Sequence, residues 1–306
     1  MLWRGRRQSG NIEDLRGRPG GFPRIGMPRG GPLGGGPFGG RMGPRSRFGG
    51  SLGLLVIAAL VLIFGGNLLD QPNQSAIDDR TAVGNSEGRS GASDEQRDFI
   101  AVVLADTEDV WNDLFGQFSR DYPEPKLVLF SGGAGSACGF AQSVTGPFYC
   151  PGDRKIYIDL SFYRELSERL KAPGDFAQAY VLAHEVGHHV QNTLGVLEDV
   201  AGLQAKLNAA ERNALSVRVE LQADCYAGLW AHHAEKTKQI LEPGDIDEAL
   251  GAASAVGDDR LQKQTGGGIV PDAFTHGTAE QRARWFRRGF ELGTIIACDT
   301  FEAAQL

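Results

Sequence analysis

Cysteine is scarce in this sequence, and its four cysteines never occur in the Cys-x-x-Cys spacing of a zinc knuckle. A basic excess is also missing, because the formal net charge is -7, which argues against a dedicated nucleic-acid binder. Hydrophobic residues nevertheless make up 41% of the 306 residues, and charged residues 23%. Most of the chain can therefore build a core, which excludes a wholly disordered protein and a polytopic membrane protein.

Residues 1–50 contain no lysine and few bulky apolar side chains, but they contain ten arginines, 16 glycines and six prolines. Such a segment buries too little surface to offset the chain entropy lost on folding, so we expect residues 1–50 to be a disordered tail. An Arg/Gly segment of this kind either binds RNA or lies on the anionic cytoplasmic leaflet of a membrane. The segment that follows favours the membrane.

Charge is absent from residues 52–69, which read LGLLVIAALVLIFGGNLL. A helix of that length spans about 27 Å, just enough for the hydrocarbon core of a bilayer. A buried core helix would show polar positions on one face, and a cleaved signal peptide would start nearer the N-terminus. We therefore expect a single transmembrane helix at residues 51–69. Arginines before it and aspartates after it predict a cytoplasmic N-terminus and an extracytoplasmic body.

Helical hydrophobic spacing begins near Asp94, after a polar stretch at residues 70–93 that we interpret as a flexible linker. The folded domain is thus expected at residues 94–306. Short apolar runs predict strands at 126–130, 148–150 and 155–159, and a Gly/Ser-rich loop is expected at 131–139. Helical patterns follow at 161–170, 175–193, 198–209, 211–236, 245–257 and 279–297. The predicted fold class is α+β, a mainly helical domain with a small β-sheet.

Residues 184–188 read His-Glu-Val-Gly-His inside a predicted helix. His184 and His188 are four residues apart and share one helix face, where two imidazoles can bind one Zn²⁺. Glu185 can hold an attacking water and take its proton as general base. Gly187 would let another backbone or the substrate approach. The alternative, two histidines without a metal, is disfavoured by the rarity of the pattern and by its helical context.

A third ligand has to come from elsewhere, because the extended pattern HExxHxxGxxH fails in this chain. The best candidate is Glu220 on a second long helix, which carries Asp224 four residues later on the same face. One of these carboxylates can bind the metal while the other accepts the free N–H of a ligating histidine. His232, His233 and His276 compete for the same role, but the first two fall about 18 Å further along the helix.

Several runs of this sequence resemble those of the bacterial neutral zinc metallopeptidases, whose members are typically anchored by one N-terminal membrane segment. The resemblance covers residues 94–300. It rests on HEVGHHVQ from residue 184, ELQADC from residue 220, PFYCPGD from residue 147, and FTHGT from residue 274 followed by Gln281 and Arg282.

This resemblance, together with a similarity to gluzincins, implies a zincin-like metallopeptidase domain that acts on peptide or protein substrates. It implies that His184, His188 and Glu220 bind one Zn²⁺ per chain. Glu185 would be the catalytic base, and Asp224 would orient a ligating histidine.

A peptidase of this kind also needs a hydrogen-bond donor for the oxyanion that develops during hydrolysis, besides the metal. His276 is a candidate, because it lies in a glycine-flanked segment just before the last predicted helix. Its competing interpretation is a structural contact of that loop. Tyr149, Tyr157 and Tyr180 are rival donors.

All four cysteines lie after the expected anchor, in a part of the chain that an external location would expose to oxidation. Four cysteines allow three pairings. We expect Cys138–Cys150, which would close a short loop, and Cys225–Cys298, which would tie the helix of Glu220 to the last helix. Free buried thiols are the alternative.

The leading functional interpretation is a membrane-anchored zinc endopeptidase that works outside the cytoplasm. The alternative is a non-catalytic, zinc-stabilised binding or scaffold protein at the membrane. An intact Glu185 argues against that alternative, because a structural zinc site has no need of this carboxylate. An RNA-associated protein is disfavoured by the acidic body and the adjacent anchor, so no specific nucleic-acid partner is expected.

Overall fold

The computed structural model of the chain describes residues 1–17, 87–142, 146–264, 266 and 268–306. The transmembrane helix expected at residues 51–69 lies outside these residues, as do the rest of the expected tail beyond residue 17 and the linker up to residue 86. Within the described ranges no helix is both long enough and apolar enough to cross a membrane. The anchor therefore stays a prediction.

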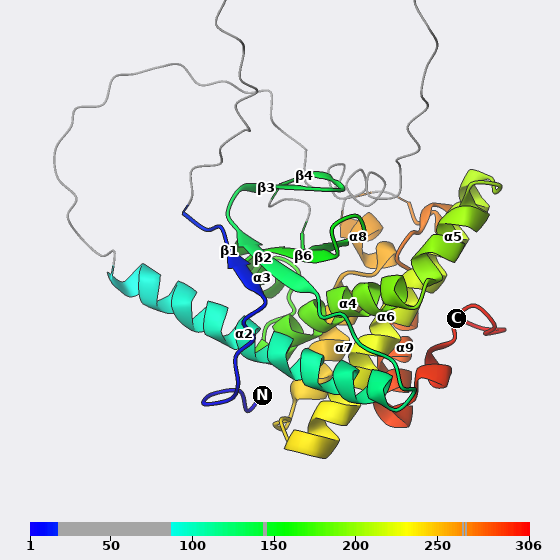
Figure 1. Ribbon diagram of the computed structural model, residues 1–306. Helices are drawn as coiled ribbons and strands as arrows, with labels where there is room; N and C mark the ends of the chain where they lie inside the picture. The colour runs from blue at the N-terminus through cyan, green and yellow to red at the C-terminus, as the bar shows by residue number, and fades with distance from the viewer. Residues whose placement is uncertain (18–86, 143–145, 265, 267) are drawn as a thin grey trace, which may run out of the picture.

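Helices dominate the described part of the chain, and a small sheet lies on one side of them (Figure 1), which confirms the expected mainly helical class. Two short 3-10 turns, η2 (Pro271–Ala273) and η3 (Ile295–Cys298), flank the last helix. The α-helices are α2 (Glu87–Gly116), α3 (Ser161–Glu168), α4 (Asp175–Thr193), α5 (Val196–Gln204), α6 (Ala209–Lys238), α7 (Asp245–Ala255), α8 (Asp258–Gln264) and α9 (Ala279–Leu292).

The sheet has the strand order β1-β2-β6-β5. Its strands β1 (Ile12–Asp14), β2 (Lys126–Phe130) and β6 (Lys155–Asp159) run parallel, and β5 (Phe148–Cys150) is antiparallel to β6. A separate hairpin pairs β3 (Gly133–Ser136) with β4 (Gly139–Gln142), where the sequence predicted a loop. Two antiparallel segments of four residues satisfy their backbone groups mutually, even though glycine and serine make them look like a loop.

Both faces of the central strands are buried, which explains why KLVLF and KIYID are almost continuously apolar. Leu127 and Ile156 face the main core with the helices. Val128 and Tyr157 face a smaller cluster with Ala134 of the β3–β4 hairpin. The hairpin thus covers the second face of the sheet.

Helix α6 is the centre of the helical layer, because it packs against α4 on one side and α9 on another. At Gly289 of α9 a Cβ atom would overlap the carbonyl oxygen of Cys225 on α6, so glycine is required for this close approach. A capping box of Asn208 and Glu211 starts α6, and a second one of Thr278 and Gln281 starts α9. These caps fix where the site-bearing helices begin.

The first 17 residues pack onto the body, so the expectation of a disordered tail is wrong for them. Strand β1 extends the sheet alongside β2, with Ile12 in register with Leu127, and Met1 is buried in the main core. Composition averaged over 50 residues hid this segment, because its strand, Ile-Glu-Asp, is mostly polar. The exposed edge of β2 supplies the missing stabilisation through backbone hydrogen bonds.

Polar contacts also hold the N-terminal segment in place. Glu108 on α2 is 2% exposed, and its carboxylate accepts hydrogen bonds from the side chains of Ser9 and Asn11. The amino group of Met1 lies 2.7 Å from Oδ1 of Asp175, in the first turn of α4. A buried carboxylate without hydrogen-bond partners would destabilise the domain. The N-terminal segment supplies these partners and is therefore part of the domain.

This packing bears on the expected membrane topology. Strands β1 and β2 belong to one sheet, so residues 1–17 and the body occupy the same compartment in the folded protein. A single crossing at residues 51–69 would place the two strands on opposite sides of a membrane. The expected topology stays a prediction, and the pairing of β1 with β2 is the observation that it has to accommodate.

Helix boundaries differ from the expected ones at several places; the last helix, for example, ends at Leu292 and not at residue 297. Helix α2 starts at Glu87, inside the expected 70–93 linker, because extending a packed helix costs less than nucleating one. Helix α8 (Asp258–Gln264) was not predicted, since seven residues carry too little periodicity to be recognised. Helix α4, in contrast, occupies the predicted residues 175–193.

Candidate metal centre

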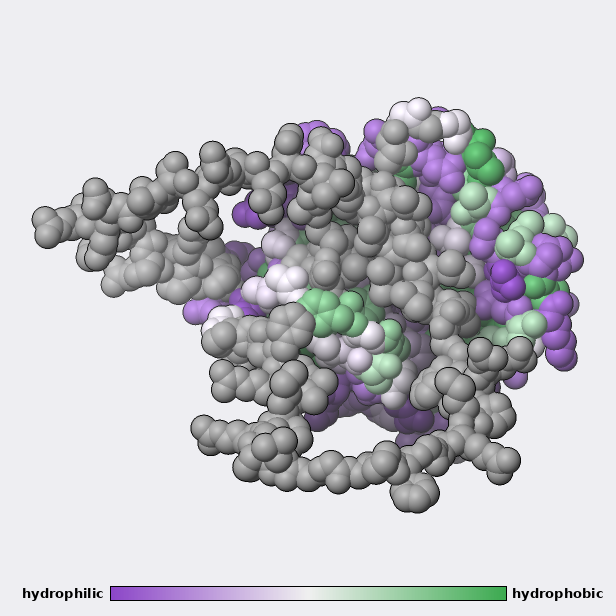
Figure 2. Space-filling view, turned by 90° about the horizontal axis from the view of Figure 1, so that it is seen from above, coloured by the Kyte–Doolittle hydropathy of each residue, from purple (hydrophilic) through white to green (hydrophobic). Residues whose placement is uncertain are grey.

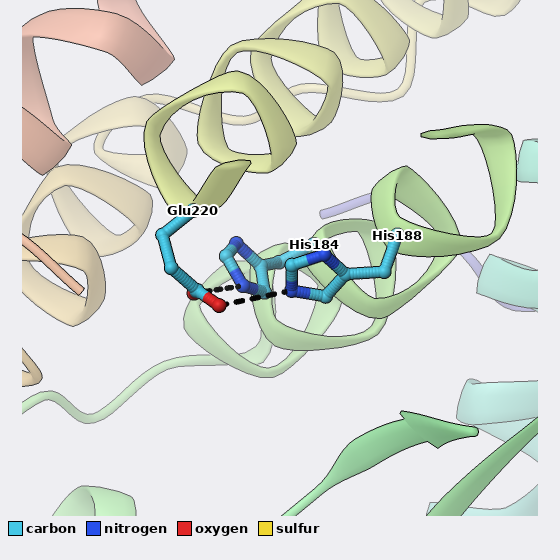
Figure 3. A group of neighbouring side chains, drawn as sticks. All are labelled: His184, His188 and Glu220. Atoms are coloured by element: carbon cyan, nitrogen blue, oxygen red, sulfur yellow. Dashed lines mark ion pairs between the residues drawn. The ribbon is translucent and has the colours of Figure 1, made fainter. Parts of the chain in front are cut away.

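Two helices bring the predicted metal ligands together. His184 and His188 lie on α4 and Glu220 on α6, and one ligand atom of each lies within 4.8 Å of the others. Both imidazoles point their Nε2 atoms at the Glu220 carboxylate (Figure 3), at 3.2 Å for His184 and 3.5 Å for His188. Two imidazole nitrogens and one carboxylate are a donor set of catalytic zinc sites, which leave the fourth position open. The residues present therefore fit zinc.

The other nitrogen of His184 contacts a buried carboxylate. Nδ1 of His184 lies 2.8 Å from Oδ1 of Asp224, which also accepts hydrogen bonds from Arg282 and from the hydroxyl of Tyr180. Burial opposes the charge of Asp224, but the Arg282 guanidinium holds the pKa of this carboxyl below its usual range. An ionised Asp224 can accept the Nδ1–H proton, which leaves Nε2 of His184 free for a metal. This is the contact expected of Asp224.

The other nitrogen of His188 contacts an amide. Nδ1 of His188 lies 2.8 Å from Oε1 of Gln191, whose side chain is fully buried. In the sequence, Gln191 stands where the extended HExxHxxGxxH pattern has its glycine. Its spacing of three residues after a ligand on the same helix was the signal that could have revealed this role.

Glu185, the predicted general base, lies beside the ligands. It is 7% exposed, and it lines the same cavity as His184, His188 and Glu220. Burial raises the pKa of Glu185, although the neighbouring histidines partly oppose this effect. A carboxylate with a raised pKa is a better proton acceptor near neutral pH than an ordinary one.

The metal centre opens into a cavity of about 550 Å³. Apart from the site itself its lining is mainly apolar, so it can hold hydrophobic substrate side chains and exclude water. Figure 2 shows the outer surface of the molecule from above, on the side that carries β3, β4 and α5. Where this surface is visible, hydrophobic patches lie among hydrophilic ones. Apolar lining residues include Phe148, Phe162, Leu170, Val181, Leu197 and Val200.

His276, the candidate oxyanion donor, lines this cavity together with Glu185 and Glu220. Its Nδ1 lies 3.2 Å from Oδ1 of Asp258, and its backbone N–H donates to the other carboxylate oxygen at 2.7 Å. Burial opposes protonation, but the nearby carboxylates of Glu220 and Asp258 raise the pKa of His276. Asp258 therefore fixes the ring and favours its protonated, donating form.

The rival donors and rival ligands are engaged elsewhere. The hydroxyl of Tyr157 donates to Asp153, and that of Tyr180 donates to Asp224. The hydroxyl of Tyr149 lies 3.1 Å from Nδ1 of His189, whose Nε2 donates to a backbone carbonyl, so the Tyr149 hydroxyl donates to Nδ1. The competing ligands His232 and His233 contact backbone carbonyl oxygens of the α9 end, Phe290 and Gly293 respectively. Neither histidine belongs to the metal centre.

Arg282 is the other functional residue that reasoning from the sequence missed. It is 4% exposed and donates from Nε and Nη2 to the two carboxylate oxygens of Asp224, at 2.8 and 2.9 Å. The sequence showed Arg282 only as part of a matching run. Its partner lies 58 residues earlier on another helix, so no local pattern could connect them.

Both predicted disulfides are present, with Cys138 bonded to Cys150 and Cys225 bonded to Cys298. The expectation of these pairs is confirmed. The second bond joins α6, one residue after Asp224, to η3 at the C-terminal end of the domain. Its α6 end is therefore adjacent in sequence to Asp224, the residue that contacts His184.

Comparison with known proteins identifies relatives that match nearly the whole chain. A family model described as "Putative neutral zinc metallopeptidase" matches residues 1–301. The uncharacterised protein YpfJ of Escherichia coli is 45% identical over 301 residues, covering 98% of this chain and 99% of that protein. The uncharacterised protein Mb2605 of Mycobacterium bovis is 44% identical over 257 residues, or 79% of this chain and 84% of that protein. No solved structure matches.

Proposed function

The chain belongs to the neutral zinc metallopeptidase family, and from that membership we propose that it is a zinc-dependent endopeptidase with Glu185 as general base. One observation carries the proposal: His184, His188 and Glu220 converge in a cavity that Glu185 also lines. The position of Glu185 beside the three candidate ligands supports a role in proton transfer.

The residues of the cavity have different roles in the proposed peptide hydrolysis. Zinc bound by the three ligands would act as a Lewis acid on the scissile carbonyl and lower the pKa of the attacking water. Glu185 accepts the proton of that water and returns it to the leaving nitrogen. His276, held by Asp258, donates to the oxyanion. The apolar lining excludes bulk water and holds substrate side chains.

A non-catalytic zinc-stabilised scaffold is the competing function. It accounts for three metal ligands but not for Glu185, which is buried at a cost in solvation and contacts the same cavity. A structural zinc site also has four protein ligands, whereas this centre brings three together within the described residues. The endopeptidase explains both features.

We further propose that the domain works outside the cytoplasm. Two disulfides support this location, because such bonds persist in oxidising compartments. The docked N-terminal segment, residues 1–17, belongs to the same compartment as the body. Membrane association through residues 51–69 is part of the proposal, but not as one crossing that separates β1 from β2.

Metal content and peptide cleavage of the full chain test this function together. We expect one zinc ion per chain, cleavage that a chelator abolishes, and loss of most metal in His184→Ala and in Glu220→Ala, with His232→Ala as a control that keeps it. Glu185→Gln should retain zinc and lose about 10²–10⁴-fold in rate, because the amide cannot take a proton. Zinc binding without any cleavage of a broad peptide library would favour the scaffold instead.

A further inference from the structure

A chain of buried amides connects a metal ligand to a disulfide. Nδ1 of His188 contacts Oε1 of Gln191 at 2.8 Å, and Nε2 of Gln191 donates to Oε1 of Gln222 at 3.1 Å. Nε2 of Gln222 in turn donates to the backbone carbonyl oxygen of Cys298 at 3.1 Å. Cys298 is bonded to Cys225, so the chain starts at the Cys225–Cys298 disulfide and ends on a metal ligand. We call Gln191 and Gln222 the glutamine relay.

Backbone carbonyls determine the direction of every bond in this relay. The carbonyl oxygen of Cys298 can only accept, so the amide nitrogen of Gln222 faces it and its oxygen faces Gln191. The carbonyl oxygen of Val219 likewise accepts from Nε2 of Gln191 at 2.7 Å. Both contacts of Nε2 of Gln191, with the Val219 carbonyl and with Oε1 of Gln222, therefore require a donor at this position. The amide oxygen of Gln191 then faces His188.

The oxygen of Gln191 fixes the tautomer of His188. An amide oxygen is an acceptor, so Nδ1 of His188 carries a proton, and in the neutral imidazole Nε2 is then the nitrogen with the free lone pair. Nε2 is the atom that faces Glu220 at 3.5 Å. The relay thus presents the metal-binding nitrogen of His188 in the form that a metal requires.

Gln191 also sets the distance between ligands on two different helices. It lies on α4 with His188, and its amide nitrogen is bonded to the carbonyl of Val219, the residue directly before Glu220 on α6. Gln191 is fully buried and Gln222 is 6% exposed, so water cannot easily replace either side chain. Movement of α6 relative to α4 would therefore change the positions of both His188 and Glu220.

We propose that Gln191 is a positioning residue for the metal centre and that Gln222 makes its action depend on the Cys225–Cys298 disulfide. The inference rests on the proposed metal site but not on peptide hydrolysis. When the disulfide is intact, it holds the Cys298 carbonyl against Gln222. Without it, hydrogen bonds between Arg218 and Thr300 still join the C-terminal segment to α6, but the Cys298 carbonyl is no longer fixed by a covalent bond. The contact of Gln222 with that carbonyl then weakens, and Gln191 is held mainly by the Val219 carbonyl.

Zinc affinity of the full chain, measured by competition with a chelator, tests the first part. Gln191→Leu should weaken zinc binding about 10–100-fold, the usual cost of removing a partner of a ligating histidine. Gln222→Leu should weaken it less, since the Val219 contact survives. The control is Gln178→Leu, which changes a glutamine on the same helix that bonds to Gln96 and not to a ligand.

Cobalt substitution separates positioning from a general loss of stability. A changed visible spectrum of the Co²⁺ form in Gln191→Leu, but not in Gln178→Leu, would show altered ligand geometry at the metal. An unchanged affinity and an unchanged spectrum in Gln191→Leu would overturn the positioning role. If the parent chain binds no zinc at all, the proposed metal site itself fails, which this series distinguishes from failure of the relay.

A double-mutant cycle tests the disulfide. Replacing Cys225 and Cys298 by serine should weaken zinc binding when Gln222 is present, and add little in the Gln222→Leu background. Replacing Cys138 and Cys150 is the matched control, because that bond touches no relay residue. Additive losses would overturn the link through Gln222. Zinc affinities are compared only for variants whose circular dichroism matches the parent, and Cys298→Ala alone serves if the double variant does not fold.

Discussion

Gly187, within the metal-binding motif, contacts the backbone of Ala223 on the neighbouring helix. A Cβ atom at Gly187 would lie 3.0 Å from the Ala223 carbonyl oxygen, closer than side chains normally approach. The expectation that Gly187 admits another backbone is thus confirmed by α6. Because Ala223 lies between Glu220 and Asp224, this glycine sets how closely both acids approach the histidines.

We predict that Gly187→Ala forces α4 and α6 apart and destabilises the fold by about 1–3 kcal/mol, the typical cost of overpacking. Zinc affinity should fall in the same variant, because the ligands come from both helices. Gly202→Ala is the control, since a Cβ at Gly202 meets nothing within 4 Å. Chemical denaturation and zinc titration of both variants give the measurement; equal behaviour of the two would contradict the steric argument.

The metal centre was largely predictable because its signals are local. Helical spacing and the HExxH motif located α4 and both histidines, and the acids four residues apart located Glu220. The partners of these residues were not predictable in the same way. Arg282 reaches Asp224 from α9, and Gln222 reaches Gln191 from α6. Such contacts depend on how helices pack, which no local pattern of residues records.

The fold was predictable where hydrophobic spacing is strong, as in β2 and β6, and failed where polar sequence gains its structure from a neighbour. Strand β1 reads Ile-Glu-Asp and forms because β2 offers an open edge. The β3–β4 hairpin reads as a Gly/Ser-rich loop and is stabilised by mutual pairing and by Ala134 under the sheet. In both cases the stabilising partner is distant in the sequence or lacks β propensity.

Arg282 should be essential for stability, because it compensates a carboxylate that is fully buried. Arg282→Met leaves Asp224 without its counter-charge, and we expect a loss of about 3–5 kcal/mol in the free energy of unfolding. The double variant Arg282→Met with Asp224→Asn should recover part of this loss, since no uncompensated charge is then buried. Arg287→Met, at an exposed position on the same helix, should change stability by about 0.5 kcal/mol or less. Urea denaturation measures all three.

His189 should make stability depend on pH between the pKa values of its unfolded and folded states. Its Nε2 donates to the carbonyl of Pro123, its Nδ1 contacts the hydroxyl of Tyr149, and burial lowers the pKa of His189 to about 4. In the unfolded chain the pKa is about 6.5, so the unfolded state binds a proton first as pH falls. The contribution of His189 to the free energy of unfolding is therefore fully present above about pH 6.5, and it is lost progressively as the pH falls to about 4.

The size of this effect follows from the difference between the two pKa values, and it is at most about 3 kcal/mol. We expect the stability difference between the parent and His189→Phe to shrink as pH falls through this window. Unfolding by urea at several pH values, with zinc removed from both proteins, measures it. A difference that is constant with pH would mean that His189 does not stay neutral in the folded state.

Docking of the N-terminal segment should be visible in cells. Leu2 and Phe118 are both exposed, one on the segment and the other just after α2, and neither lines the cavity of the candidate metal centre. Leu2→Cys and Phe118→Cys should react alike with a membrane-impermeant maleimide in intact cells, because β1 and β2 share one sheet and hence one compartment. Labelling at position 118 with protection at position 2, reversed when the cells are lysed, would instead support a single crossing between them.

Deleting residues 1–17 is a second test of docking. If a crossing separated the two strands, β1 could not pair with β2 in the mature protein, and the deletion would leave the thermal stability of the domain unchanged. With docking, the same deletion removes the β1–β2 hydrogen bonds and the partners of Glu108, and the unfolding temperature should fall by several degrees, as a loss of about 1 kcal/mol or more produces.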